Sequence, residues 1–395
     1  IEEIVVTAQK REQAIQDVPI SITALPGDFV AEAGIDNAHE IAKFTPNVNF
    51  ATNPCCPIIY IRGFGTSFNA SSFDPTVGYA IDDLSISQSI YFADPLYDIE
   101  RIEVLRGPQG TLFGKNTTGG LFNITTAAPT KEFTGFLTGR VGGLGVHRFE
   151  AALGGPLGSL GDWAQFRFAV LEAQEAGDVE NTLLGTRQPR AAQQAARLKL
   201  ALQPVDGLDV LFIASRMQTD ARAFQFQQHE LRDSSVQLLR RYDPAFDDDG
   251  LNHKNSVNRL TLTERDTDLI QGNLRYDLGD LGPLHDAEVV AVLGYTGFDA
   301  SAPIDFDFSP ADVAYFKTPA PILYDQSSAE LRFSGVVPAP LAFGELELLA
   351  GALFFESSFV SDVPVVAGED FEEFLLSAPG FELATGQPAV GGVGF

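Results

Sequence analysis

The chain has 395 residues, with 53 acidic against 26 basic side chains and a formal net charge of -27. Because 45% of its residues are hydrophobic, it is too apolar for a disordered acidic chain, and its acidic balance argues against nucleic-acid binding. No apolar run reaches the ~18 residues of a transmembrane helix. Two classes remain, a soluble β-rich protein and a membrane β-barrel, because barrel strands need only about 10 residues of alternating character.

The residues before Pro129 predict a small α/β domain, because short strand-like stretches alternate with turns rich in Gly, Pro and Asn. The segment Asp28–Phe44 predicts one helix, with Phe29, Ala33, Ala38 and Ile41 on a shared face and Pro46 after it. The expected strands of this part are Val18–Leu25, Ile58–Ile61, Val77–Ile81, Ile99–Leu105 and Leu121–Thr126.

After Lys131 the pattern changes to recurring segments of alternating polarity, joined by short turns on one side and longer polar connections on the other. That difference in connection length between the two sides is typical of an outer-membrane barrel, and a soluble sandwich does not require it. The nine expected strands are Phe133–Val141, Arg148–Leu153, Trp163–Ala173, Ala195–Leu202, Leu208–Arg216, Asp268–Leu278, Ala287–Phe298, Gln326–Val337 and Glu345–Ser357.

About nine visible strands do not make a closed barrel, because single-chain bacterial barrels have an even strand count. The tail from Phe359 to Phe395 indicates an acidic extracellular loop with no closing strand. We therefore expect a partial wall, either because the chain is a fragment or because a further chain completes the barrel.

Several motifs of the first domain, taken in order, carry a family resemblance. The run Glu2–Ala8 resembles a TonB box, and Arg62-Gly63-Phe64 resembles an arginine–glycine motif of a plug domain. The run from Asp98 through Arg106-Gly107-Pro108 to Gly120 resembles the second plug signature. Over residues 1–128 the chain thus resembles the TonB-dependent outer-membrane receptors. The resemblance implies a TonB box and linker over 1–10, a plug over 11–128, and over 129–395 the N-terminal part of a transmembrane antiparallel β-barrel.

The resemblance implies that Ile4, Val5, Val6, Thr7 and Ala8 bind the TonB energy-coupling protein. β-Branched residues suit this role, because an extended segment can add as a strand to the edge of a partner's sheet. The alternative is an ordinary edge strand of the plug.

Two further sets of residues take roles from the resemblance. Arg62 and Arg106 are expected to pair with carboxylates of the barrel wall, since a guanidinium binds a carboxylate through two parallel hydrogen bonds. The plug loops that would face the outer vestibule carry aromatic and amide side chains suited to a bulky, partly apolar ligand. These candidate ligand contacts are Phe68, Asn69, Phe73, Gln88, Tyr91 and Phe92.

Chemistry of other kinds is not predicted. The run Gly110–Asn116 lacks the spacing of a phosphate loop, no nucleophile–base motif is recognisable, and the scattered His predict neither a metal site nor a cofactor. Asp243 and Asp247–Asp249 lack the spacing of a calcium loop and indicate a solvated acidic loop. Adjacent Cys55 and Cys56 favour a strained disulfide over a metal site.

The expected function is active, TonB-dependent uptake of a scarce nutrient across the bacterial outer membrane, with a ferric siderophore-like or other bulky ligand. The expected partners are the coupling protein, a small-molecule or metal-chelate ligand, outer-membrane lipid and lipopolysaccharide. The alternative function is a passive porin-like barrel, or a structural or adhesive one.

Overall fold

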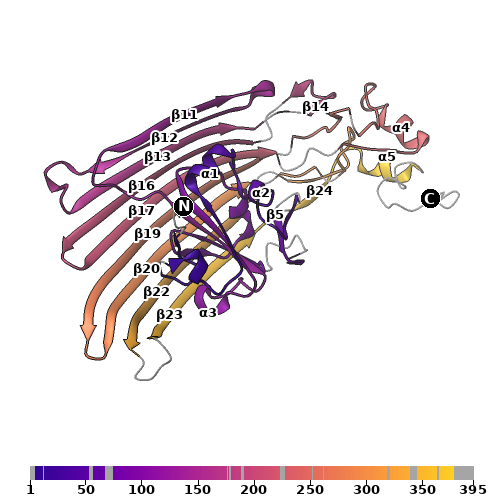
Figure 1. The fold of residues 1–395 in the computed structure, drawn as a ribbon. Helices are drawn as coiled ribbons and strands as arrows, with labels where there is room; N and C mark the ends of the chain where they lie inside the picture. The colour runs from indigo at the N-terminus through magenta and orange to yellow at the C-terminus, as the bar shows by residue number, and fades with distance from the viewer. Residues whose placement is uncertain are drawn as a thin grey trace.

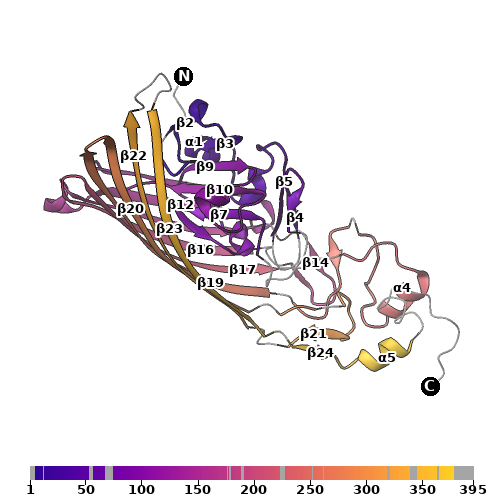
Figure 2. The same ribbon diagram turned by 90° about the horizontal axis from the view of Figure 1, so that it is seen from below.

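The computed structural model shows two layers, a long curved wall of antiparallel strands and a smaller domain that lies against its concave face (Figure 1, Figure 2). The structure describes residues 5–11, 13–52, 57–66, 74–175, 177, 179–187, 191–222, 227–250, 252–260, 262–301, 303–305, 307–317, 321–338, 345–362 and 364–377.

The wall is one sheet of nine antiparallel strands in chain order. All nine strands expected from the sequence are confirmed, and several run further than the alternation indicated. They are β11 (Thr134–Val141), β12 (His147–Pro156), β13 (Ala164–Gln174), β16 (Ala191–Val205), β17 (Leu208–Arg222), β19 (Leu262–Leu281), β20 (Leu284–Ser301), β22 (Pro321–Pro338) and β23 (Glu345–Ser361).

The alternation along each wall strand separates two faces. Lys199, Arg197 and Ala195 of β16 are buried beneath the smaller domain. On the opposite face Ile270, Leu293 and similar apolar side chains are exposed. Successive residues of a strand point to opposite sides, so one sequence pattern supplies both an inner surface and an apolar outer surface.

The smaller domain is built on a five-stranded mixed sheet in the order β3-β9-β10-β7-β8, in which only β10 and β7 run parallel. The strand β9, which lies between β3 and β10, is buried on both faces, because Ile102 and Val104 belong to one core cluster and Leu105 belongs to another. The strands are β3 (Ile22–Pro26), β7 (Val77–Ile81), β8 (Leu84–Ile86), β9 (Ile99–Arg106) and β10 (Gly120–Thr126).

Shorter elements surround this sheet. A second small sheet joins β4, β5 and β6, and β1 pairs with β2. Their bounds, with those of the helices, are β1 (Val5–Val6), β2 (Gln13–Ala14), η1 (Ile15–Asp17), α1 (Gly27–Glu32), α2 (Ala38–Ile41), β4 (Val48–Thr52), β5 (Pro57–Ile61), β6 (Phe64–Gly65), η2 (Ser89–Ala93) and α3 (Gly110–Phe113).

The single helix predicted over Asp28–Phe44 is wrong, because the structure has two short helices there, α1 and α2. The break lies at Gly34, which adopts a left-handed φ of 65°. Asn37 then caps α2, since its side-chain oxygen accepts a hydrogen bond from the Glu40 N–H at 3.2 Å. A left-handed glycine followed by an Asn cap ends one helix and begins the next.

The long connections at one end of the wall fold together into a cap. Its elements are η3 (Gly143–Gly145), β14 (Glu180–Asn181), β15 (Thr186–Arg187), α4 (Asp233–Leu239), β18 (Lys254–Asn255), β21 (Ala314–Phe316), β24 (Val365–Ala367) and α5 (Phe371–Leu376). The short helix η4 (Gly158–Leu160) is not part of the cap and lies in the turn between β12 and β13. Leu239, Phe246, Val313 and Phe374 share a small core there. The tail expected to be loop from Phe359 instead begins inside β23 and contains β24 and α5.

Candidate functional site

The N-terminal segment predicted as a coupling strand is docked on the smaller domain. Val5 and Val6 form β1, which pairs antiparallel with β2. Val6 and Ala8 are fully buried against Leu105 and Phe113, whereas Val5 is 44% exposed. Ile4 lies outside the described residues. The segment is therefore extended, as expected, and its alternate side chains fix it to the domain.

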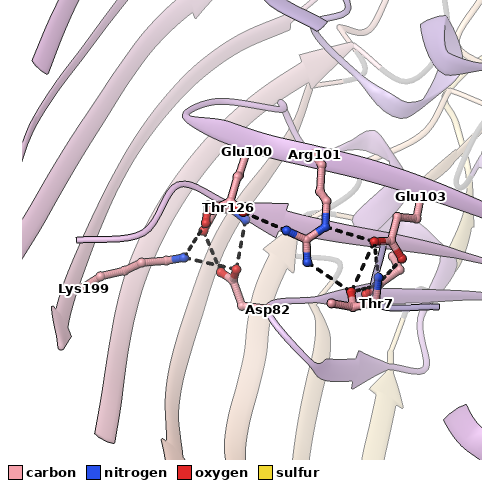
Figure 3. Close-up of polar contacts among 8 residues, drawn as sticks. Thr7, Asp82, Glu100, Arg101, Glu103, Thr126 and Lys199 are labelled. Carbon is pink, nitrogen blue, oxygen red and sulfur yellow. Dashed lines mark hydrogen bonds and ion pairs between the residues drawn. The ribbon is translucent and has the colours of Figure 1, made fainter. Parts of the chain in front are cut away.

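Thr7 joins this segment to a buried carboxylate (Figure 3). Its N–H donates to Glu103 Oε1 at 2.7 Å, and its hydroxyl lies 3.2 Å from the same oxygen. Arg101 donates to Glu103 Oε1 at 3.0 Å and to the Thr7 hydroxyl at 3.2 Å, and Asn123 donates to Glu103 Oε2 at 3.1 Å. Both peptide and side chain of Thr7 thus hold the segment in place.

Lys10 ties the same segment to the wall. Its buried Nζ lies 3.6 Å from carboxylate oxygens of both Asp83 and Glu330, and 4.4 Å from the centre of the Phe113 ring. Arg332 of β22 approaches Asp83 at 3.6 Å and Glu330 at 3.4 Å. Segment, smaller domain and wall meet at this quartet of two cations and two carboxylates.

A further set of ion pairs across this interface joins cations of the wall to carboxylates of the smaller domain. Arg167 Nε donates to Asp98 Oδ2 at 2.8 Å, and Lys199 Nζ donates to Asp82 Oδ1 at 3.1 Å and to the Thr126 carbonyl at 2.8 Å (Figure 3). Arg265 pairs with Asp94 in the same way. Sequence reasoning missed these pairs, although charged residues at inward positions of barrel strands could have signalled them.

Burial changes the acidity of one of these carboxylates. Burial of Asp94 raises its pKa to about 6, although the charge and hydrogen bond of Arg265 act to lower it. Removing a charged carboxylate from water favours its neutral form, and the nearby cation offsets only part of that effect. This contact between domain and wall is therefore sensitive to mildly acidic pH.

The two arginines predicted to pair with wall carboxylates contact the smaller domain itself. Arg106 donates to the carbonyls of Pro46 at 3.3 Å and Ile22 at 3.4 Å. Arg62 is exposed in a left-handed turn conformation, with φ at 53°. Within the described part of the chain neither arginine forms an ion pair with the wall, so that pairing stays a prediction.

The predicted ligand contacts fall into two groups. Phe68, Asn69 and Phe73, together with Cys55 and Cys56, lie outside the described residues, and Gln88 is half-buried. Tyr91 and Phe92 are 3% exposed. Neither presents a surface to a ligand as placed here: Tyr91 hydrogen-bonds Thr296 of the wall at 2.9 Å, and the Phe92 ring packs edge-on against Tyr79 and Phe122.

The acidic residues of the cap have structural roles. Asp243, expected in a solvated loop, is buried and accepts hydrogen bonds from the hydroxyls of Thr182 and Ser256, each at 2.6 Å. These bonds lower its pKa although burial opposes them. Among the residues that the structure describes, no group of three or more His, Cys, Asp or Glu could hold a metal ion.

The domain on the concave face matches a known family. Residues 14–121 match the model of the TonB-dependent receptor plug domain. Over these residues the chain is a TonB-dependent receptor plug domain. These residues make up most of the smaller domain, which is called the plug from here on, and the long sheet is called the wall. Among the described residues no helix is both long and apolar enough to cross a membrane.

Relatives and solved structures agree with this assignment. The chain is 28% identical over 222 residues to the pesticin receptor of Yersinia pestis, covering 55% of this chain and 32% of that protein. It is 31% identical over 140 residues to an iron-regulated outer membrane virulence protein of Vibrio cholerae, covering 34% and 21%.

The fold is similar to that of the ferric yersiniabactin uptake receptor from Yersinia pestis, with a TM-score of 0.65 at 20% identity over 87% of this chain and 50% of that one. The chain thus spans about a third of the pesticin receptor and half of the solved receptor.

Proposed function

We propose that the protein imports a bulky iron chelate of the ferric siderophore class across the bacterial outer membrane, driven through the TonB energy-coupling protein. The observation that carries the proposal is the position of the plug on the concave face of the wall, joined to it by buried ion pairs such as Asp98–Arg167. Passage along that face requires the plug to move. The similarity to an iron-regulated outer membrane virulence protein and to a ferric yersiniabactin uptake receptor supports the location and the ligand class.

The N-terminal segment is the proposed handle for that movement. Arg11 pairs with Glu347 near the start of β23, beside the short connection between β22 and β23. In barrels of this kind the short turns face the periplasm, the side from which a coupling protein acts. Residues Ile4, Val5, Val6, Thr7 and Ala8 would leave the plug and add as a strand to the partner's sheet.

The remaining proposed contacts follow the family arrangement. Phe68, Asn69, Phe73 and Gln88 are the proposed ligand contacts, and any contribution from Tyr91 or Phe92 requires the plug to rearrange first. Arg62 and Arg106 are proposed to bind carboxylates of the barrel wall. The apolar outer face would lie in lipid and lipopolysaccharide, and no catalytic residue takes part because the coupling is mechanical.

Deletion of residues 2–8 tests the proposal. Uptake of an iron chelate by cells should be lost, while binding of the same chelate to the purified receptor stays unchanged. Passive diffusion through a porin-like barrel predicts uptake independent of these residues, so retained uptake in the deletion variant would refute energy coupling through this segment.

A further inference from the structure

Glu103 is a fully buried carboxylate in β9 of the plug. A buried carboxylate is stable only when cations or hydrogen-bond donors surround it. Within the plug, Arg101 and Asn123 donate to it. The peptide N–H and the hydroxyl of Thr7, which belong to the N-terminal segment, complete its surroundings (Figure 3).

We propose that Glu103 is the positioning residue that holds the N-terminal coupling segment on the plug and sets how readily that segment detaches. The proposal rests on the proposed function, because it assigns a residue to the release step of the coupling segment.

The geometry favours Glu103 over the apolar contacts as the residue that sets the position of the segment. Val6 and Ala8 are buried on the plug, but apolar burial has no direction. The 2.7 Å bond from the Thr7 N–H to Glu103 has a charged acceptor, and such bonds are shorter and stronger than neutral ones. It fixes the register of the segment through the backbone of Thr7, and the Thr7 hydroxyl adds a second contact to the same oxygen at 3.2 Å.

The same geometry makes detachment reversible. When Thr7 leaves, Glu103 keeps the hydrogen bonds from Arg101 and Asn123, and Arg101 is itself held by Glu100 at 2.7 Å. The carboxylate is then still paired, so the plug does not need to unfold. Water can replace the two bonds of Thr7 once the segment has gone.

Hydrogen exchange of the segment tests the proposal directly. The complete receptor is purified in detergent, without ligand or coupling protein, and exchange is followed by mass spectrometry on a peptide covering residues 5–11. Glu103→Gln keeps the shape of the side chain but removes its charge, and should accelerate exchange by about 10- to 100-fold, the factor expected for losing a hydrogen bond to a charged group. Glu100→Gln, on the same strand and also bound to Arg101, should change it less than about threefold, as for an exposed ion pair.

Two further measurements keep the result interpretable. Exchange of a peptide covering Gly120–Thr126 reports whether the plug itself stays folded. If Glu103→Gln exposes that strand as well, Thr7→Val decides the question, because it removes the hydroxyl contacts and leaves the interior of the plug intact. Several-fold faster exchange of the segment in Thr7→Val, with the strand protected, supports the proposal.

Exchange of the segment unchanged in both variants would overturn the role of Glu103. That result would leave the proposed function standing if deletion of residues 2–8 still abolished uptake. Conversely, retained uptake in the deletion variant would refute the coupling mechanism even where Glu103 controls exchange.

Discussion

The ion pair between Asp98 and Arg167 gives the sharpest test of what fixes the plug to the wall. Arg167 Nε donates to Asp98 Oδ2 at 2.8 Å, and a second guanidinium nitrogen pairs with Oδ1. The Asp98 side chain is 3% exposed and that of Arg167 is 10% exposed. Asp98 thus contacts two wall strands. Arg167 belongs to β13, and the Asp98 N–H donates to Glu150 of β12 at 2.8 Å.

Arg167→Met removes the charge and keeps an apolar stem of similar length. Asp98 is then left buried without its cation, and breaking a buried pair in this way costs about 3–5 kcal/mol. Since 1.4 kcal/mol corresponds to a factor of ten, protection of β9 and β10 against hydrogen exchange should fall by about 10²- to 10³-fold. The double variant Arg167→Met with Asp98→Asn should recover part of that loss, because no charge remains unpaired and Asn tolerates the left-handed φ of 51° at this position.

Lys43→Met is the matched control, because it breaks an exposed ion pair of the plug in which Lys43 lies 3.2 Å from Glu40 and is 59% exposed. Pairs of that kind contribute about 0–1 kcal/mol. If Arg167→Met lowered the protection of β9 and β10 no more than Lys43→Met does, the buried pair would not be what holds the plug.

Two more predictions concern the plug. Asp94→Asn tests the raised pKa of Asp94, about 6. Between the unfolded pKa near 4 and this value the folded state binds more protons than the unfolded state, so the free energy of unfolding should fall by about 2 kcal/mol as pH rises from about 4 to 6. Chemical unfolding at both pH values should show this slope in the wild type and not in the variant; equal slopes contradict the assignment. Gly120→Ala should destabilise the plug, because its Cβ would lie 2.4 Å from the Leu105 carbonyl oxygen, whereas Gly110→Ala has nothing within 4 Å. Similar thermal unfolding of both variants would show that β10 can move away from Leu105.

Much of the fold could be predicted from local pattern. The nine wall strands follow from alternation of period two, because one face must be apolar for lipid and the other must fit the plug. The plug was recognisable from ordered motifs such as Arg106-Gly107-Pro108, which lie at the end of β9. The division of residues 28–44 into two helices was not foreseen, since a backbone position such as Gly34 reveals its left-handed conformation only when the chain is folded.

Part of the candidate site could also be predicted from the sequence, and part of it could not. The sequence indicated the extended form of the proposed coupling segment, since Val5, Val6 and Thr7 favour β conformation whatever surrounds them. It did not indicate that Glu103, ninety-six residues away, accepts the hydrogen bonds of Thr7. Nor did it indicate that wall cations such as Arg167 and Lys199 contribute ion pairs to the described interface.

The sequence by itself determined the plug domain and the strand order of the wall, because these depend on motifs contiguous in the chain and on periodicity. Only the tertiary structure decided which charges meet. Asp82, Asp94 and Asp98 lie in turns and short connections of the plug, and their partners Lys199, Arg265 and Arg167 lie on three different wall strands. The strength of an ion pair depends on the distance between its charges and on their burial, and the spacing of residues along the chain determines neither.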